Sequence, residues 1–351
     1  MFRVLAGAVT NAPPEILRAH LDTIRWQQVN DVAVDLCYIA DPALPEESAE
    51  VLSSVARVLP AKPKPAEAEY AITSTTHHWT IPTFHWLARE KQRLLDLAVE
   101  ERYDAVWLVD SDLLCGPDTL ASLLASEKPV VSAVFWTRWT PGAAPLPQVW
   151  LRQPYELDGK GWKAHEFLEA LANRQLVRVG GLGACTLIRT DVLDRVGYWP
   201  LVEGLPSHGM WQGEDRHFCI RAQRAHVELW ADAWPDIFHV YRPEDVEKIP
   251  DALERLNQSF MSPRMGDLVS FTVEPCEEPA LADYKEHVRG RLGQLKLLTE
   301  LEQCILDMMV GDERLVSIQF PHWYPIPQYR GRKRTLRVRL IGAKPYHDPV
   351  N

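Results

Sequence analysis

Apolar and polar positions form blocks along the first third of the chain that predict strands and helices in turn. Residues 2–9 and 32–39 are apolar runs typical of buried strands, and residues 15–28 repeat apolar side chains with a helical period. A strand, a helix and a strand within about 40 residues form a βαβ unit, from which parallel sheets are built. A long helix over 82–102 then leads into a strand over 105–109.

The same alternation continues to residue 245 and predicts an α/β fold whose sheet is mostly parallel and flanked by helices. The further predicted elements are a strand over 129–135, a glycine-interrupted strand over 177–189, a short helix over 190–196, a helix over 216–225 and a strand over 226–230. Residues 60–69 are rich in proline and predict a surface excursion between two elements.

The pattern changes near residue 266. Residues 266–273 alternate like a half-exposed strand, residues 295–310 indicate a strand that passes into a helix, and two antiparallel-type strands follow over 311–321 and 331–341. The sequence therefore predicts three parts: a large α/β domain over 1–245, a linking helix over 246–265 and a small α+β domain over 266–351.

Composition narrows the class of protein. The chain has 351 residues, of which 46% are hydrophobic and 25% charged, as in ordinary globular proteins. It has no apolar run of about 18 residues, and its start reads as a strand rather than a signal peptide, so we expect no membrane span and a cytoplasmic location. The six cysteines are far apart and include no Cys-x-x-Cys pair, which predicts neither a zinc site nor a disulfide framework.

The charge is uneven along the chain. A net charge of −10 argues against a protein whose whole surface binds nucleic acid. Residues 311–345, however, carry eight Lys and Arg residues against Asp312 and Glu313. This basic stretch is either a solvated strand face or a surface for an acidic partner.

Two carboxylates stand at the end of the strand over 105–109. Asp110 and Asp112 are one residue apart, so both can reach a single ion at the end of the strand. Oxygen ligands of this kind suit a hard divalent cation that also holds phosphates. The alternative is a strand end followed by a helix cap, since Asp118 and Thr119 open the next helical run.

Three later features carry further candidate chemistry. The glycines of residues 180–183 do not precede a helix, which excludes a dinucleotide fingerprint and leaves a tight turn or the close approach of a ligand. Glu214 and Asp215 open a helix, where carboxylates serve either as caps or as catalytic groups. His239 follows an apolar run and is either a core histidine or a metal ligand.

In this order the features of residues 1–245 resemble the nucleotide-sugar glycosyltransferases of the A-type fold. The similarity is to family 2 and its relatives, with some similarity to the Anp1-type mannosyltransferases. The residues that carry it are Thr10, Asn11, Asp41, Asp110, Ser111, Asp112, the glycines of 180–183, Gly213, Glu214, Asp215 and His239. The resemblance implies a Rossmann-like sheet and the transfer of a sugar from a UDP or GDP donor to a hydroxyl acceptor, with Mn²⁺ or Mg²⁺ bound.

The resemblance also implies roles for particular residues. Asp112 would be the principal metal ligand, with Asp110 and His239 completing the site, because a divalent cation stabilises the charge that develops on the leaving phosphate. Asp215 would be the base of an inverting reaction, with Glu214 orienting the acceptor; in a retaining, Anp1-type enzyme both would only bind the acceptor. The residues implied in binding the donor are Thr10, Asp41, Lys91, Asp110 and Ser111.

Two sets of residues have competing interpretations. Arg89 and Lys91 lie near the nucleobase or the diphosphate by the resemblance, whereas the helical pattern alone places them on a solvated face. Several tryptophans fall in the segments expected around the cleft, where aromatic rings either stack on sugars or fill the core. They are Trp136, Trp139, Trp150, Trp199 and Trp211.

The last part of the chain resembles the FKBP-like prolyl isomerase domain of trigger factor. This resemblance is carried by residues 309–314, 320–321, 331–332 and 338–340, with a tyrosine between the second and third of these segments. Leu297, Leu298 and Leu301 stand where aromatic residues would floor the proline pocket, so isomerase activity is not expected. A degenerate copy would instead grip a polypeptide acceptor, orient the catalytic domain or mediate self-association into a homo-oligomer.

The sequence is compatible with several functions. The second domain favours a peptide or protein acceptor, while a saccharide, a lipid-linked sugar or modified DNA stays open. A nucleotidyltransferase would also use paired carboxylates, but residues 11–14 lack the Gly-rich basic loop that such enzymes carry after the first strand. The remaining class is a peptide-binding or chaperone-like protein with an inactive transferase half, against which the intact Asp110, Asp112, Asp215 and His239 count.

Overall fold

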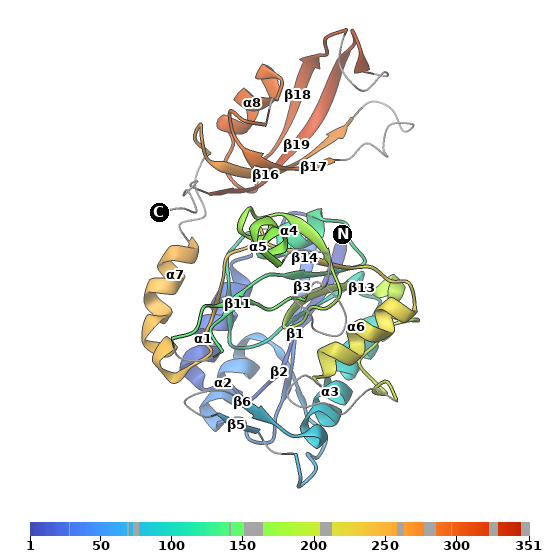
Figure 1. Cartoon of the computed structure of the whole chain (residues 1–351), viewed down its shortest axis with the longest axis vertical. Helices are drawn as coiled ribbons and strands as arrows, with labels where there is room; N and C mark the ends of the chain where they lie inside the picture. The colour runs from blue at the N-terminus through green and yellow to red at the C-terminus, as the bar shows by residue number, and fades with distance from the viewer. Residues whose placement is uncertain are drawn as a thin grey trace.

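The computed structural model describes residues 1–27, 29–68, 70–72, 77–139, 142–150, 164–203, 213–257, 263–276, 286–295, 297–322 and 329–344. Two parts are visible in Figure 1: a large module, residues 1–257, and a smaller C-terminal module, residues 263–344. They correspond to the α/β and α+β parts expected from the pattern of the sequence.

The large module alternates strands and helices along the chain. Its elements are β1 (Phe2–Gly7), β2 (Val9–Thr10), α1 (Pro14–Arg25), β3 (Val32–Ala40), α2 (Glu46–Val55), β4 (Arg57–Pro60), β5 (Tyr70–Ile72), β6 (His77–Trp79), α3 (Ile81–Glu100), β7 (Ala105–Val109), β8 (Leu113–Cys115), α4 (Thr119–Ala125), β9 (Val130–Ala133), β10 (Trp136–Thr137), β11 (Leu146–Pro147), α5 (Ala164–Ala172), β12 (Leu176–Val179), β13 (Cys185–Arg189), η1 (Thr190–Val192), α6 (Glu214–Arg224), β14 (Leu229–Asp232), β15 (Ile237–His239), η3 (Pro243–Lys248) and α7 (Ile249–Asn257).

A nine-stranded sheet forms the centre of this module. In the described part its strands lie in the order β12-β14-β9-β13-β7-β1-β3-β2, with β4 also paired to β3. Five of these pairings are parallel and three, all involving β12 or β13, are antiparallel. The sheet is therefore mixed and mostly parallel, which confirms the predicted Rossmann-like α/β class.

Helices cover both faces of the sheet because its strands are apolar on both sides. In β7 every residue is buried. Val106 and Leu108 face a core that α3, α5 and α6 complete, whereas Trp107 and Val109 face the opposite core, with α1 and α4. The parallel strands end at the same edge, and Asp110 follows β7 there. The fold thus places the candidate motif at the carboxyl edge of the sheet.

The C-terminal module consists of β16 (Leu268–Pro275), β17 (Glu286–Arg291), α8 (Thr299–Leu306), β18 (Glu313–Gln319) and β19 (Lys333–Lys344). Its strands form an antiparallel sheet in the order β17-β16-β19-β18, with α8 packed on one face. Leu301 is buried in this core, and Leu297 and Leu298 pack against it. The module is α+β as predicted, and its likeness to an FKBP-like domain stays a prediction.

Three predicted elements differ from the structure. The single strand expected over 177–189 is two strands, β12 and β13, which lie apart in the sheet. The helix expected over 190–196 is only the single 3₁₀ turn η1, followed by turn residues 193–195. The strand expected at the start of 295–310 is absent from the described residues. Leu298 has an extended backbone (φ −65°, ψ 142°) but joins no ladder, and its side chain packs on the module's core ahead of α8.

Several elements were not expected from the pattern, among them α2, β4, α5 and β17. The linking helix is α7, which begins after the 3₁₀ turn η3 and packs against α1 and β8 of the large module. Within the described residues, no helix combines the length and apolarity needed to cross a bilayer.

Candidate functional site

The Asp110–Asp112 segment is a tight turn between β7 and β8. The Asp110 amide donates to the carbonyl oxygen of Ala184 at 2.8 Å, and the Leu113 amide donates back to the Asp110 carbonyl oxygen at 3.1 Å. Ser111 is buried, and its hydroxyl lies 2.7 Å from that of Thr10. The turn therefore fixes Ser111 inward, while the side chains of Asp110 and Asp112 are 40% and 35% exposed.

His239 lies against Asp112, 127 residues away in the chain. Strands β8 and β15 form an antiparallel ribbon, in which His239 pairs with Leu113. As a result His239 Nε2 lies 3.3 Å from Asp112 Oδ2, and Nδ1 lies 2.8 Å from the hydroxyl of Thr137. A second hydrogen bond of this kind fixes the orientation of a metal-binding imidazole.

This pair fits a divalent cation that is shared with a phosphate ligand. The described residues contain no group of three His, Cys, Asp or Glu side chains arranged to hold a metal ion by themselves. Mg²⁺, and Mn²⁺ in the same role, commonly takes only one or two protein ligands and fills its shell with water and phosphate oxygens. Asp112 and His239 would supply two such ligands if a cation bound here, with Asp110 beside them.

Lys91 is the centre of a carboxylate cluster. Its ammonium group lies 2.8 Å from Glu214 Oε1, 3.1 Å from Asp215 Oδ1 and 3.9 Å from Asp110 Oδ1, and its side chain is only 4% exposed. Lys91 comes from α3, whereas Glu214 and Asp215 open α6, so the contact between α3 and α6 assembles the cluster. Arg89, by contrast, is on the exposed side of α3 and stacks on Trp199 at 4.1 Å.

The cluster has an excess of negative charge. Burial alone would lower the pKa of Lys91, but Asp215, Glu214 and Asp110 together raise it well above its ordinary value. Partial desolvation in the turn raises the pKa of Asp110, with Asp112, Asp215 and Glu214 adding to the shift and Lys91 opposing it. One ammonium group among four carboxyl groups, those three and Asp112, leaves a net charge of about −3 when all are ionised, which favours binding of a divalent cation.

Two glycines of residues 180–183 allow close packing around this cluster. A Cβ at Gly183 would lie 2.3 Å from Asp215 Oδ2, and one at Gly181 would lie 2.7 Å from the ring of Trp150. Gly183 and Gly181 thus make room for side chains of the same chain, whereas the expected approach of a ligand stays a prediction.

Asp41 and Thr10 lie at the same edge of the sheet, after β3 and in β2. Asp41 is buried; its Oδ1 accepts a hydrogen bond from the Ala43 amide at 2.8 Å, and Oδ2 pairs with Lys64 at 3.2 Å. Lys64 Nζ also lies 4.8 Å from the centre of the Trp86 ring. The parallel pairing of β2 and β3 thus brings together Thr10 and Asp41, the residues predicted to hold the nucleoside.

Aromatic rings surround His239. Phe135 and Tyr241 each have their ring centre 5.1 Å from the imidazole, and Trp139 packs on Tyr241 at 5.6 Å. Trp139 is 37% exposed, so its ring is available to a ligand. Trp150 packs on Gly181 and Trp199 on Arg89, and Trp211 is outside the described residues.

Sequence reasoning missed three residues of the site. Lys64 lies in a proline-rich excursion that gave no sign of a role, and Thr137 lies in a two-residue strand. Arg242, from the segment after β15, donates to the carbonyl oxygens of Arg138 and Trp139 and so holds the loop that carries Trp139. The adjacency of Tyr241 and Arg242 to His239 was the available signal.

A cavity of about 600 Å³ lies away from this site. Phe2, Val32 and Arg189 line it at the amino edge of the parallel strands, and Arg339 and Ile341 of the C-terminal module close it. It contains none of the candidate site residues. The candidate chemistry is therefore at the carboxyl edge and not in this cavity.

The similarity of the chain to known proteins lies in its structure and not in its sequence. No family model and no curated protein sequence matches the chain. Among solved structures, the chain is similar to a crystal structure of S. aureus TarS, residues 1–349, with a TM-score of 0.40 and 12% sequence identity over 73% of this chain. The chain spans 65% of that structure. A similarity this distant assigns neither a family nor an activity.

Proposed function

We propose that this chain is a divalent-metal-dependent glycosyltransferase that moves a sugar from a nucleoside-diphosphate donor to a hydroxyl acceptor. The observation that carries the proposal is the contact of Asp112 with His239 beside the Lys91–Glu214–Asp215 cluster. Both lie at the carboxyl edge of an open α/β sheet, where such sheets bind their ligands. A cation ligand pair next to an acid–base candidate suits an inverting glycosyl transfer from a diphosphate.

Asp112 and His239 would hold Mn²⁺ or Mg²⁺, with Asp110 beside them. When bound, the cation neutralises the charge that develops on the leaving diphosphate. Thr137 keeps the imidazole of His239 turned toward Asp112. The bond that breaks joins the anomeric carbon to the diphosphate oxygen, and the bond that forms joins that carbon to the acceptor oxygen.

Asp215 is the proposed base that takes the proton of the acceptor hydroxyl. Its side chain is 21% exposed, whereas that of Glu214 is 8% exposed, so Asp215 is the more accessible of the two to a ligand. The start of α6 favours a charged carboxylate at this position. Lys91 holds both carboxylates, and we assign Glu214 to fixing Lys91 rather than to contact with the acceptor. With Asp215 as base the reaction inverts the configuration of the sugar.

We place the donor and sugar sites at the same carboxyl edge of the sheet. Thr10 and Asp41, with Ser111 behind Thr10 and Lys64 paired to Asp41, are the proposed nucleoside site. Trp139 is the proposed stacking surface for a sugar ring, because it is exposed and belongs to the aromatic group around His239. The acceptor is a hydroxyl group of a saccharide, peptide or protein.

Calorimetric titration of the full chain with UDP- and GDP-sugars, with and without Mn²⁺, tests this proposal. We expect one nucleotide to bind, at least about tenfold more tightly with Mn²⁺, and Asp112→Asn to abolish the gain. Asp194→Asn changes an exposed carboxylate and is the matched control. Asp215→Asn should bind the donor normally and transfer no sugar. If no nucleotide binds with metal present, the chain is not such an enzyme, and a binding module becomes the better description.

A further inference from the structure

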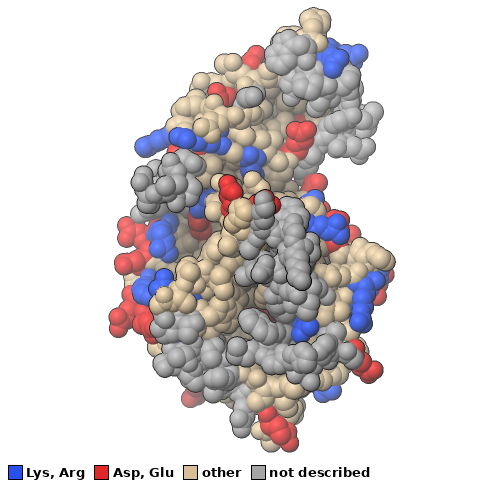
Figure 2. All heavy atoms as spheres, in the orientation of Figure 1, with Lys and Arg blue, Asp and Glu red and all other residues tan. Residues whose placement is uncertain are grey.

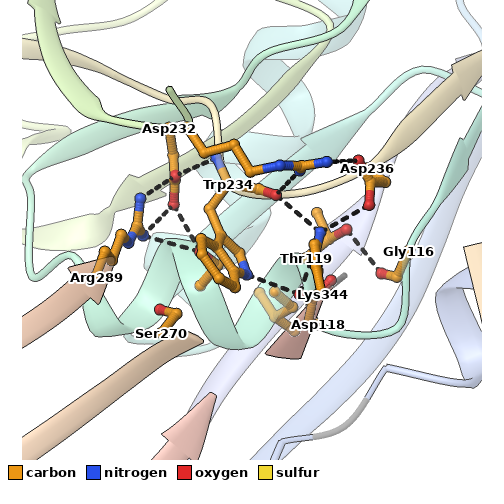
Figure 3. Close-up of polar contacts among 12 residues, drawn as sticks. Gly116, Asp118, Thr119, Asp232, Trp234, Asp236, Ser270, Arg289 and Lys344 are labelled. Carbon is orange, nitrogen blue, oxygen red and sulfur yellow. Dashed lines mark hydrogen bonds and ion pairs between the residues drawn. The ribbon is translucent and has the colours of Figure 1, made fainter. Parts of the chain in front are cut away.

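The two modules meet through charged side chains that are buried. Lys344, the last residue of β19, is 3% exposed. Its ammonium group donates to the carbonyl oxygen of Trp234 at 2.8 Å and to Asp236 Oδ2 at 2.9 Å, and it lies 3.4 Å from Asp118 Oδ2 (Figure 3). Within the described part of the chain, Lys344 is the cationic side chain that pairs with Asp118, whose carboxyl group is almost wholly buried.

A second contact lies beside the first. Arg289 of β17 binds both carboxylate oxygens of Asp232, which is fully buried, and its Nη2 donates to Ser122 Oγ of α4 at 2.9 Å (Figure 3). The backbone of β19 also comes very close, since a Cβ at Gly342 would lie 2.7 Å from both Asp118 Oδ2 and Trp234 Nε1. The C-terminal module is thus docked with a fixed register on the segments around residues 118 and 232–236.

These segments are the outer ends of the β8–β15 ribbon. Asp236 immediately precedes β15, and its carbonyl oxygen accepts a hydrogen bond from the Gly116 amide at 2.8 Å, just after β8. At the inner end the Val240 amide donates to the Asp112 carbonyl oxygen at 2.9 Å. One end of the ribbon is therefore held by Lys344, and the other carries Asp112 and His239.

We propose that the C-terminal module positions the candidate cation site, with Lys344 as the positioning residue that acts through the β8–β15 ribbon. The inference rests on the proposed function only in treating Asp112 and His239 as cation ligands. It assigns the module a role in building the site, apart from any contact with an acceptor.

The ribbon is short, with three residue pairs, and its strand β8 also packs against α1 and α7 of the large module. Lys344 adds a contact at the outer end, where it pairs with the buried carboxyl group of Asp118 and with Asp236. Arg174 of the large module also binds Asp236 and the Trp234 carbonyl oxygen, but among the described residues it forms no ion pair with Asp118. Without Lys344, Asp118 would be a buried carboxylate without its cation, facing the Asp236 carboxylate, and the ribbon's outer end would open to relieve it.

Hydrogen exchange of two backbone amides tests the inference without any ligand. In the full chain we expect Lys344→Met to speed exchange at both Gly116 and Val240 by at least about tenfold, because both amides close the ribbon. Arg337→Met is the matched control, since Arg337 lies on the same strand in an exposed ion pair with Glu274 and should leave both rates unchanged. Faster exchange at Gly116 alone would mean that Lys344 acts only at the interface, and it would overturn the proposal, as would unchanged rates at both.

Mn²⁺ titration in the presence of the nucleotide that binds gives a second readout. Lys344→Met should weaken Mn²⁺ binding at least about tenfold, and equal affinity in a folded variant would contradict the inference. If the wild-type chain binds no Mn²⁺ with any nucleotide, the proposed function fails. The hydrogen-exchange rates of the Gly116 and Val240 amides still test the present inference. If Lys344→Met does not fold, Gly342→Ala replaces it, because its added Cβ pushes β19 away from the same carboxylate.

Discussion

Gly183 and Asp215 approach so closely that only a hydrogen atom fits between them. A Cβ on residue 183 would lie 2.3 Å from Asp215 Oδ2 and 2.7 Å from its carboxyl carbon. The two residues come from the segment before β13 and from the start of α6. The position of the proposed base therefore depends on the absence of a side chain at residue 183.

Gly183→Ala should remove transferase activity while leaving the donor bound. The added methyl group displaces the Asp215 carboxylate from Lys91, so we expect turnover to fall at least about 100-fold, the loss typical of a general base. Donor affinity should change less than about twofold. The double variant Gly183→Ala/Asp215→Asn should be no slower than Asp215→Asn alone, since both changes remove one function. Additive losses of turnover in the double variant would mean that Gly183 does not act by positioning Asp215.

Trp139→Ala should weaken binding of the sugar and not of the nucleotide. A stacked aromatic ring contributes about 1 kcal/mol, which is roughly a fivefold change in affinity. The affinities of nucleotide and nucleotide-sugar, or the KM of the acceptor, measure the effect. Trp136→Ala is the matched control, because Thr137 faces His239 and the side chain before it in the strand points the other way. Equal effects of the two variants would remove Trp139 from the site.

Arg289→Met should destabilise the chain by about 3–5 kcal/mol, because it leaves the fully buried Asp232 without its cation. The control is Arg178→Met on β12, the strand next to the one that carries Asp232. This change breaks an exposed ion pair with Glu228 and should lower the free energy of unfolding by less than about 1 kcal/mol. Urea denaturation of both variants measures the difference. The double variant Arg289→Met/Asp232→Asn should recover part of the loss, and no recovery would point to lost packing instead.

Stability should fall as the pH drops from about 6.5 to 4. His20 is buried between the Leu113 carbonyl oxygen and the Tyr38 hydroxyl, and burial lowers its pKa to about 4 from an unfolded value of 6.5. The unfolded chain therefore binds more protons in this window, at a cost of about 3 kcal/mol by pH 4. Burial similarly lowers the pKa of His217 to about 4. The pKa of Asp232 is lowered, because Arg289 outweighs the effect of burial, so its contribution is lost only below pH 3.8.

Urea unfolding at several pH values isolates the His20 contribution. The stability of His20→Gln should depend less steeply on pH than that of the wild-type chain. His165→Gln, on the exposed face of α5, should retain the full dependence. Identical slopes for all three chains would place the acid sensitivity elsewhere.

The sequence pattern predicted the strand over 105–109 and the carboxylates that follow it, because an apolar run depends only on neighbouring residues. Trp107 and its neighbours form an apolar strand, and Asp110 ends it in the structure as in the sequence. The contact of His239 with Asp112 matches the pairing implied by the resemblance, whereas the spacing of the two residues alone gave no sign of it. The metal, the donor and the reaction stay predictions.

Lys91 shows what a local pattern cannot provide. The helical period allowed Arg89 and Lys91 a common solvated face, and Arg89 is exposed as expected. Lys91 is buried because Glu214 and Asp215 reach it from more than 120 residues away. The basic stretch of the C-terminal module is similar. Figure 2 shows some of its Lys and Arg side chains on the surface, yet Lys344 is buried against carboxylates of the same chain.

The docking of β19 on the large module limits how the chain can be divided. A fragment ending at residue 257 would keep every candidate site residue and the whole nine-stranded sheet. It would nevertheless lose Arg289 and Lys344, leave Asp232 and Asp118 without counter-charges and expose Trp234 to water. An inactive fragment of this kind would therefore say nothing about the catalytic residues, and the shortest form suitable for assay extends through residue 344.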